Sequence, residues 1–135
     1  MNITAFHQAC HNNSIEIAAL FLERGIDVNL TAGDLCRTPL HYAATNPNPS
    51  LAFFEFLINK GADPKLLSRR SMSKRKPSTN VLGYLFQNGT WNEPKRHVID
   101  FLLDHGADVN LDNKDNLLAA LCKYNLPPPQ YRFQN

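Results

Sequence analysis

Three segments of this chain have nearly the same sequence. They read LFLERGIDVN (20–29), FLINKGADPK (56–65) and FLLDHGADVN (101–110). Each has an apolar pair, a polar pair, a glycine, one alanine or isoleucine, and an aspartate. The glycines are Gly25, Gly61 and Gly106, at steps of 36 and 45 residues. Repetition at such a period predicts a row of stacked units rather than a single closed core.

Each repeated glycine comes at the end of a segment with helical periodicity. Glycine is common just after a helix, because that position often takes a positive φ angle. The expected helices are 15–24, 51–60 and 95–105. In the first of them, apolar residues recur at helical spacing and are expected to face the stack. These residues are Ile15, Ala18, Ala19 and Leu22.

A second motif precedes each of these helices. Residues 38–44 read TPLHYAA, and residues 4–10 read TAFHQAC. The chain therefore resembles the ankyrin-repeat family, whose signature is T-P-L-H-x-A. The segments 80–86 (NVLGYLF) and 116–122 (NLLAALC) are more degraded versions. The resemblance implies an all-α solenoid of stacked helix-turn-helix units with β-turn or hairpin fingers.

The resemblance covers most of the chain, in about three and a half repeats. We expect the array to occupy 1–126, followed by a Pro-rich tail at 127–135. The expected repeats are about 1–33, 34–75, 76–111 and a partial 112–126. No second helix is expected after Cys122, so two interpretations stay open. The tail caps the array, or the chain is part of a longer one.

Residues that recur in register are expected to hold the stack together. His7 and His41 occupy the same motif position, where a hydrogen bond between repeats is favoured over a metal or proton-transfer role. Asp27, Asp63 and Asp108 follow the three glycines in register. Such repetition favours turn stabilisation through the backbone and argues against catalysis, which needs one unique constellation.

No catalytic motif is present, and neither a metal nor a cofactor is expected. The chain lacks G-x-S-x-G, H-E-x-x-H, a Gly-rich phosphate loop and a paired-cysteine site. Its three cysteines, Cys10, Cys36 and Cys122, are odd in number and widely spaced, which favours a reducing intracellular compartment. No apolar run approaches the roughly 20 residues of a membrane span. The cytoplasm, the nucleus, or a host cytoplasm for a secreted effector all fit.

One segment carries most of the positive charge. Six of the 14 basic residues lie between Lys65 and Lys76, with no acidic residue among them. The rest of the chain has 8 basic and 12 acidic residues, a net charge of −4. Three interpretations compete for this enlarged finger: a solvated loop, a docking element for an acidic partner or lipid headgroup, and a nuclear-localisation patch. Nucleic-acid binding is not expected, because no aromatic residue lies among the charges.

The resemblance implies a non-catalytic protein-interaction module that binds another protein as a monomer. In ankyrin arrays the fingers and the inner helices line a concave groove, and the candidate contacts follow by position. They are Asp34, Leu35, Arg37, Thr45, Asn46, Arg69, Arg70, Lys74, Arg75, Lys76, Gln87, Asn88, Asp112, Asn113 and Tyr124. The alternative is a targeting domain of a longer effector or enzyme, whose basic finger docks an acidic partner or a membrane.

Overall fold

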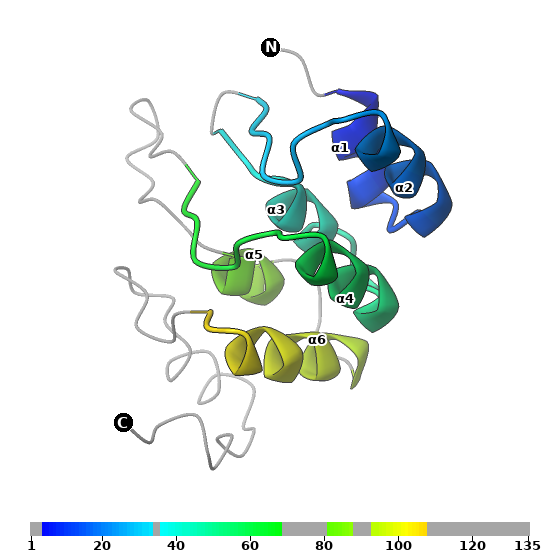
Figure 1. Cartoon of the computed structure of the whole chain (residues 1–135). Helices are drawn as coiled ribbons and strands as arrows, with labels where there is room; N and C mark the ends of the chain where they lie inside the picture. Colours follow the sequence, from blue (N-terminus) through cyan, green and yellow to red (C-terminus); the bar gives the residue numbers. More distant parts are fainter. Residues whose placement is uncertain (1–3, 34–35, 69–80, 88–92, 108–135) are drawn as a thin grey trace.

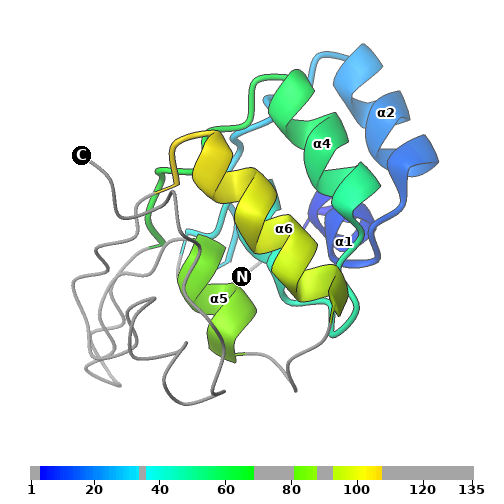
Figure 2. The same cartoon turned by 90° about the horizontal axis from the view of Figure 1, so that it is seen from below.

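Helices in consecutive pairs make up the fold (Figure 1). The computed structural model describes residues 4–33, 36–68, 81–87 and 93–107. In chain order the helices are α1 (Ala5–His11), α2 (Ile15–Glu23), α3 (Pro39–Ala44), α4 (Leu51–Asn59), α5 (Val81–Gln87) and α6 (Glu93–Asp104). Helices α2, α4 and α6 form one row, and α1, α3 and α5 form another beside it (Figures 1 and 2). The expected all-α repeat architecture is confirmed.

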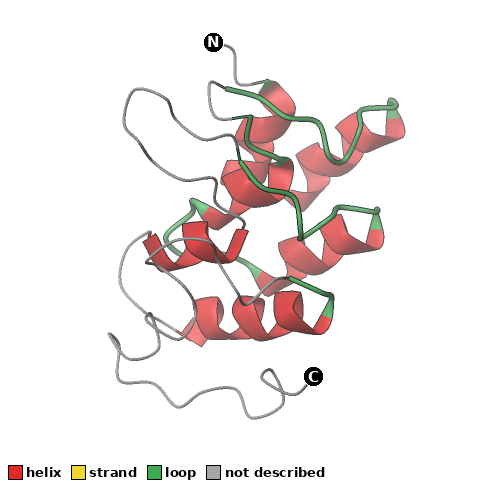
Figure 3. Ribbon diagram, turned by 90° about the vertical axis from the view of Figure 1, so that its left-hand side faces the viewer, coloured by secondary structure: helices red, strands yellow, loops and turns green. Residues whose placement is uncertain are grey.

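Neighbouring pairs pack mainly through the inner row. Helix α3 contacts both α1 and α5, and α4 contacts α6. Figure 3 shows the pairs stacked one above another. Among the described residues, no helix combines the length and the apolar character needed to cross a membrane.

The starts of the inner helices follow from the motif. The hydroxyls of Thr4 and Thr38 accept hydrogen bonds from the backbone N–H of His7 and His41, at 3.2 and 3.3 Å. A threonine at this position satisfies one of the amides that a helix start leaves without a partner. Pro39 occupies the first turn of α3, where a missing N–H costs nothing.

The three glycines lie at equivalent helix ends. Their φ angles are +93° for Gly25, +101° for Gly61 and +95° for Gly106. At the second of these ends, Gly61 N–H donates to the Ile58 carbonyl and Ala62 N–H to the Leu57 carbonyl, both at 3.0 Å. These bonds satisfy carbonyls of the last turn. Gly61 takes a left-handed conformation there, which glycine adopts readily because it has no Cβ.

The finger of the second repeat closes as a small hairpin. Ala32 and Arg37 form an isolated antiparallel bridge, with N–H to carbonyl bonds of 3.0 Å in both directions. The hydroxyl of Tyr42 donates to the Ala32 carbonyl at 3.1 Å, which ties the finger to α3. The hairpin finger expected from the motif is thus present in this repeat.

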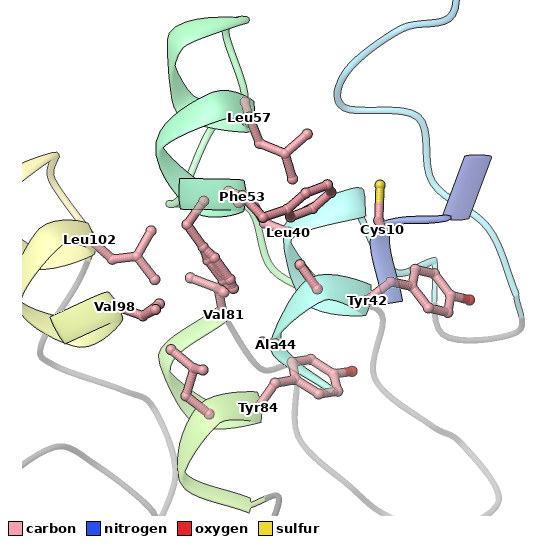
Figure 4. Close-up of a cluster of buried hydrophobic side chains, with 14 of the residues drawn as sticks. Cys10, Leu40, Tyr42, Ala44, Phe53, Leu57, Val81, Tyr84, Val98 and Leu102 are labelled. Atoms are coloured by element: carbon pink, nitrogen blue, oxygen red, sulfur yellow. The ribbon is translucent and has the colours of Figure 1, made fainter. Parts of the chain in front are cut away.

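The core runs continuously through the stack (Figure 4). Leu40, Phe53, Leu57, Val98 and Leu102 are each at most 1% exposed. They come from both helix rows, so each pair buries the apolar face of the next. Full burial of one such side chain contributes about 1.5–3 kcal/mol, so this packing is the main stabilising term.

The first outer helix is the exception to this burial. Ile15, Ile17 and Leu20 of α2 are 36%, 49% and 58% exposed, so the prediction that Ile15 faces the stack was wrong. Ile17 lies in the register of Phe53 and Val98, which are fully buried. Helix α2 is at the end of the outer row, and no earlier pair in the described structure covers this face (Figure 2).

Helix boundaries differ little from expectation. The outer helices α2 and α4 end one residue earlier than expected, at Glu23 and Asn59. The third outer helix begins at Glu93, two residues before the expected start, so Pro94 is accommodated in its first turn. The proposed repeat boundaries, and the tail at 127–135, stay predictions.

Candidate interaction surface

The histidines of the TPLH position tie each inner helix to the following finger. Nε2 of His7 donates to the Leu30 carbonyl at 2.6 Å, and Nε2 of His41 donates to the Leu66 carbonyl at 3.1 Å. The other ring nitrogen of His41 accepts from the Thr38 backbone N–H at 2.9 Å. One nitrogen donates and the other accepts, so the ring is neutral. The expected structural role of His7 and His41 is confirmed.

Burial keeps both rings uncharged. The pKa of His41 is lowered to about 4, mainly by desolvation and also by the nearby Arg37 charge, against the opposing effect of the bond to Leu66. Burial also lowers the pKa of His7, against the opposing effect of its Leu30 bond. Neither ring is free to bind a metal or move a proton while it holds a carbonyl.

The repeated aspartates stabilise turns, as their register predicted. Oδ1 of Asp27 accepts from the backbone N–H of Asn29, and Oδ1 of Asp63 accepts from that of Lys65, both at 2.9 Å. The Asn29 side chain then reaches the next repeat, donating to the Gly61 carbonyl at 3.2 Å and accepting from Asp63 N–H at 2.9 Å. Asp108 lies outside the described residues.

The far ends of α1 and α3 carry a polar cluster that joins the two repeats. The Thr45 hydroxyl donates to the Tyr42 carbonyl and accepts from Nδ1 of His11, each at 2.5 Å. The Asn46 amide donates to the His11 carbonyl at 3.0 Å. All three side chains are half-buried, so their geometry is set by the stack while one side remains accessible.

At the other end of α3, Arg37 of the finger contacts the next repeat. Its Nε donates to the Tyr84 hydroxyl at 3.0 Å, and its guanidinium carbon lies 5.1 Å from the centre of that ring. Tyr84 in turn lies against His41, with ring centroids 5.0 Å apart. Figure 4 shows Tyr42 and Tyr84 on successive inner helices, with both hydroxyls directed away from the aliphatic cluster.

Only some of the predicted contact residues can be placed. Arg37 lies before α3, while Thr45 and Asn46 lie together after it, so the inner helix separates the two groups. Gln87 is the last residue of α5. The other candidates lie outside the described residues: Asp34, Leu35, Arg69, Arg70, Lys74, Arg75, Lys76, Asn88, Asp112, Asn113 and Tyr124.

Tyr42 and Tyr84 are absent from the predicted set, although the structure gives both a place in the inner row. A signal for them was available. TPLHYAA and NVLGYLF both have tyrosine directly after the histidine position, Gly83 taking that position in the second. Tyr42 lies against His7 with centroids 5.1 Å apart, so the two tyrosines make equivalent contacts with the preceding repeat.

The cysteines of the described part are separate thiols. Cys10 is fully buried, and desolvation raises its pKa to about 12, so it is an unreactive core residue. Cys36, in the finger, is half-buried. Within the described ranges, no three His, Cys, Asp or Glu side chains are grouped so that they could hold a metal ion.

Comparison with known proteins identifies the same repeat. The family model described as ankyrin repeats, in three copies, matches residues 1–68. Ankyrin repeat protein FPV018 of fowlpox virus is 31% identical over 118 residues, which cover 87% of this chain and 15% of that protein. Palmitoyltransferase ZDHHC17 of Rattus norvegicus is 35% identical over 72 residues, covering 53% of this chain and 11% of the enzyme.

Solved structures agree on the fold. The human ASB11 ankyrin repeat domain matches with a TM-score of 0.63 and 18% identity, over 82% of this chain and 43% of that one. Ankyrin repeats are protein-interaction modules, and the fold is typically non-catalytic. The chain spans a small part of its curated relatives, so similarity to palmitoyltransferases concerns their repeats and shows no catalysis. The family model covers half of the sequence and the fold agrees with it: the chain belongs to the ankyrin-repeat family.

Proposed function

We propose that this array binds another protein, without catalysing a reaction, through the surface formed by its fingers and inner helices. The observation that supports this is the fixed position of the polar side chains on that surface. Thr45 and Asn46 are anchored on the first repeat, and Arg37 on the third. Side chains held in place before binding lose less entropy when a partner docks.

The charge distribution favours an acidic partner. Arg69, Arg70, Lys74, Arg75 and Lys76 all belong to the basic segment next to this surface in the sequence. Positive charges at this density attract acidic proteins over a Debye length of about 10 Å at 0.1 M salt. In this proposal the protein acts inside the cell as a single copy of the array, and the basic segment speeds association.

A second proposal is that the array is the targeting part of a longer protein. The similarity to palmitoyltransferases of mammals, and to AKR1 of Lachancea kluyveri at 28% identity over 119 residues, favours it. In those proteins the matched region is 11% and 15% of the whole. The same surface would then select the protein on which the rest of the chain acts.

The test is a comparison of captured proteins. Asn46→Lys alters the inner-helix end, and a second variant neutralises the six basic residues from Lys65 to Lys76. Glu55→Lys, exposed on α4 in the outer row, is the matched control. Proteins that the parent and the control capture from lysate, but that Asn46→Lys does not, would support binding through the surface of the fingers and inner helices. Identical captures from all variants, with unchanged thermal melts, would contradict the proposed surface.

A further inference from the structure

The finger arginine has more donors than the fold uses. A guanidinium carries five N–H groups in a fixed plane. In Arg37 the Nε–H is bonded to the Tyr84 hydroxyl at 3.0 Å, and the plane is placed by the ring, 5.1 Å from the guanidinium carbon. The four N–H groups on the two terminal nitrogens make no hydrogen bond within the described structure, and the side chain is only half-buried.

No carboxylate in the described part neutralises this charge. The ion pair found there joins His97 to Glu93, at 3.9 Å on α6. The Arg37 charge instead acts on neighbouring rings. It lowers the pKa of Tyr42 against the larger, opposing effect of burial, and adds to the lowering of the His41 pKa by burial. Half-buried positive charge without a counter-ion is a favourable place for an anion.

We propose that the outer edge of the Arg37 guanidinium, held by Tyr84, is a preformed binding point for the side-chain carboxylate of an acidic residue in the partner. The inference rests on the proposed function and specifies what the surface recognises. The two terminal nitrogens of a guanidinium match the two oxygens of a carboxylate, so two parallel hydrogen bonds form. Lysine has no such planar fork, and so it does not replace arginine at a bidentate site.

Tyr84 holds the Arg37 side chain in place, which distinguishes this site from an ordinary exposed charge. Exposed ion pairs contribute little, partly because two long side chains must be ordered to form them. Here the ordering of Arg37 is already part of the fold, through the hydroxyl bond and the ring contact. Tyr84 itself is anchored on His41, whose ring is fixed between Thr38 and Leu66. Binding therefore orders the carboxylate alone, which raises affinity and fixes the register of the partner.

The experiment is an NMR titration of the ¹⁵N-labelled protein. The probes are acetyl-triglutamate amide and acetyl-triglutamine amide, which differ in charge and not in length. We expect the Arg37 Nε–H signal to shift saturably with the glutamate probe and not with the glutamine probe. Arg24, exposed directly after α2 and without an ion pair in the described part, is the internal control and should show only a small, salt-sensitive drift.

Two variants separate positioning from charge. Arg37→Lys keeps the charge and should weaken the glutamate probe about tenfold, through the loss of the bidentate contact. Tyr84→Phe keeps the ring and removes the hydroxyl that holds Arg37, so it should weaken the probe severalfold. If the Arg37 signal moves no more than that of Arg24, or if Arg37→Lys binds as well as the parent, the proposal is overturned.

Its failure is distinguishable from failure of the proposed function. Capture that depends on Asn46 but not on Arg37 would leave the interaction surface in place and remove the carboxylate site. Capture insensitive to every variant would contradict the interaction surface, whatever the probe titration shows.

Discussion

The buried histidine of the first two repeats shows how a motif residue acts in this fold. His41 is 1% exposed, and its two nitrogens are used by the Thr38 amide and the Leu66 carbonyl. Protonation of the ring would place a donor against the Thr38 N–H and a charge in the core. The motif therefore supplies a connection between repeats that holds only in the neutral state.

The stability of the array is expected to fall in acid. The folded pKa of His41, about 4, is below the ordinary value of 6.5, so the unfolded chain takes up the proton first. The contribution of His41 to the free energy of unfolding is intact above pH 6.5. It falls by roughly 3 kcal/mol as the pH drops toward 4. Urea unfolding of the parent and of His41→Gln at pH 7 and pH 4.5 checks this. Equal pH dependence in the two proteins would contradict it.

Gly33 tests a close contact in the finger. Its φ is +80°, and an added Cβ would lie 2.8 Å from the Tyr42 hydroxyl, which holds the Ala32 carbonyl. Gly33→Ala should cost more than Gly25→Ala, which has a similar φ of +93° and nothing within 4 Å. We expect a difference of about 1 kcal/mol in the free energy of unfolding.

A double-mutant cycle identifies the source of that cost. With Tyr42→Phe the hydroxyl is gone, so the additional penalty of Gly33→Ala should shrink. Strict additivity of the two substitutions in chemical denaturation would show that the hydroxyl contact is not responsible.

At the level of helices, the position of a helix in the row decides how much an apolar residue on it contributes to stability. Ile17 on α2 and Phe53 on α4 both lie eight residues before a repeated glycine, yet they are 49% and 0% exposed. Helix α4 lies between α2 and α6 in this row and packs against α6, whereas α2 is the last described helix at its end (Figure 2). The same register position therefore contributes differently to stability in repeats one and two.

The same truncation on the two helices should differ strongly in cost. Leu57→Ala removes a fully buried side chain and leaves a cavity, so we expect a loss of about 2–5 kcal/mol. Leu20→Ala should change the free energy of unfolding by less than about 1 kcal/mol, because the side chain is already largely in water. Thermal and urea denaturation of both variants measures this; comparable losses would mean that α2 is covered on both sides.

On the scale of the whole molecule, stability is shared along a line of pairs. Among the described helices, the main contacts join neighbouring pairs, since α3 packs between α1 and α5, and α4 packs against α6. Such arrays behave as a sum of unit and interface terms, so damage to one pair weakens its neighbours. Helix α6 is the last described helix of the outer row, and its core residues join it to the pair before it.

A charge in the core of α6 should disrupt the array. Leu102 is 0% exposed, so Leu102→Asp buries a carboxylate without a designed partner. We expect a marked loss of helical circular dichroism and of the thermal transition. Arg96→Asp, exposed on the same helix, is the control and should be close to the parent. A Leu102→Asp protein as helical and heat-stable as the parent would show that the repeat register is wrong.

Much of the fold was predictable because it depends on local chemistry repeated in register. The glycine ends, the histidine ties and the aspartate turns each need a few residues at fixed spacing, and each appears as predicted. The interaction surface was less predictable. Arg37, Thr45 and Asn46 were selected by position alone, and their bonds to Tyr84 and His11 join residues 47, 34 and 35 apart.

The sequence by itself determined the repeat, the helix ends and the residues that join consecutive units, since these follow from short-range geometry. The tertiary structure decided which apolar side chains are covered and which polar ones are held. Ile17 has the same register as the buried Phe53 and Val98, and its place at the end of the row leaves it 49% exposed. Arg37 is likewise an ordinary finger residue until stacking brings Tyr84 beneath it, because contacts between repeats exist only once the units are assembled.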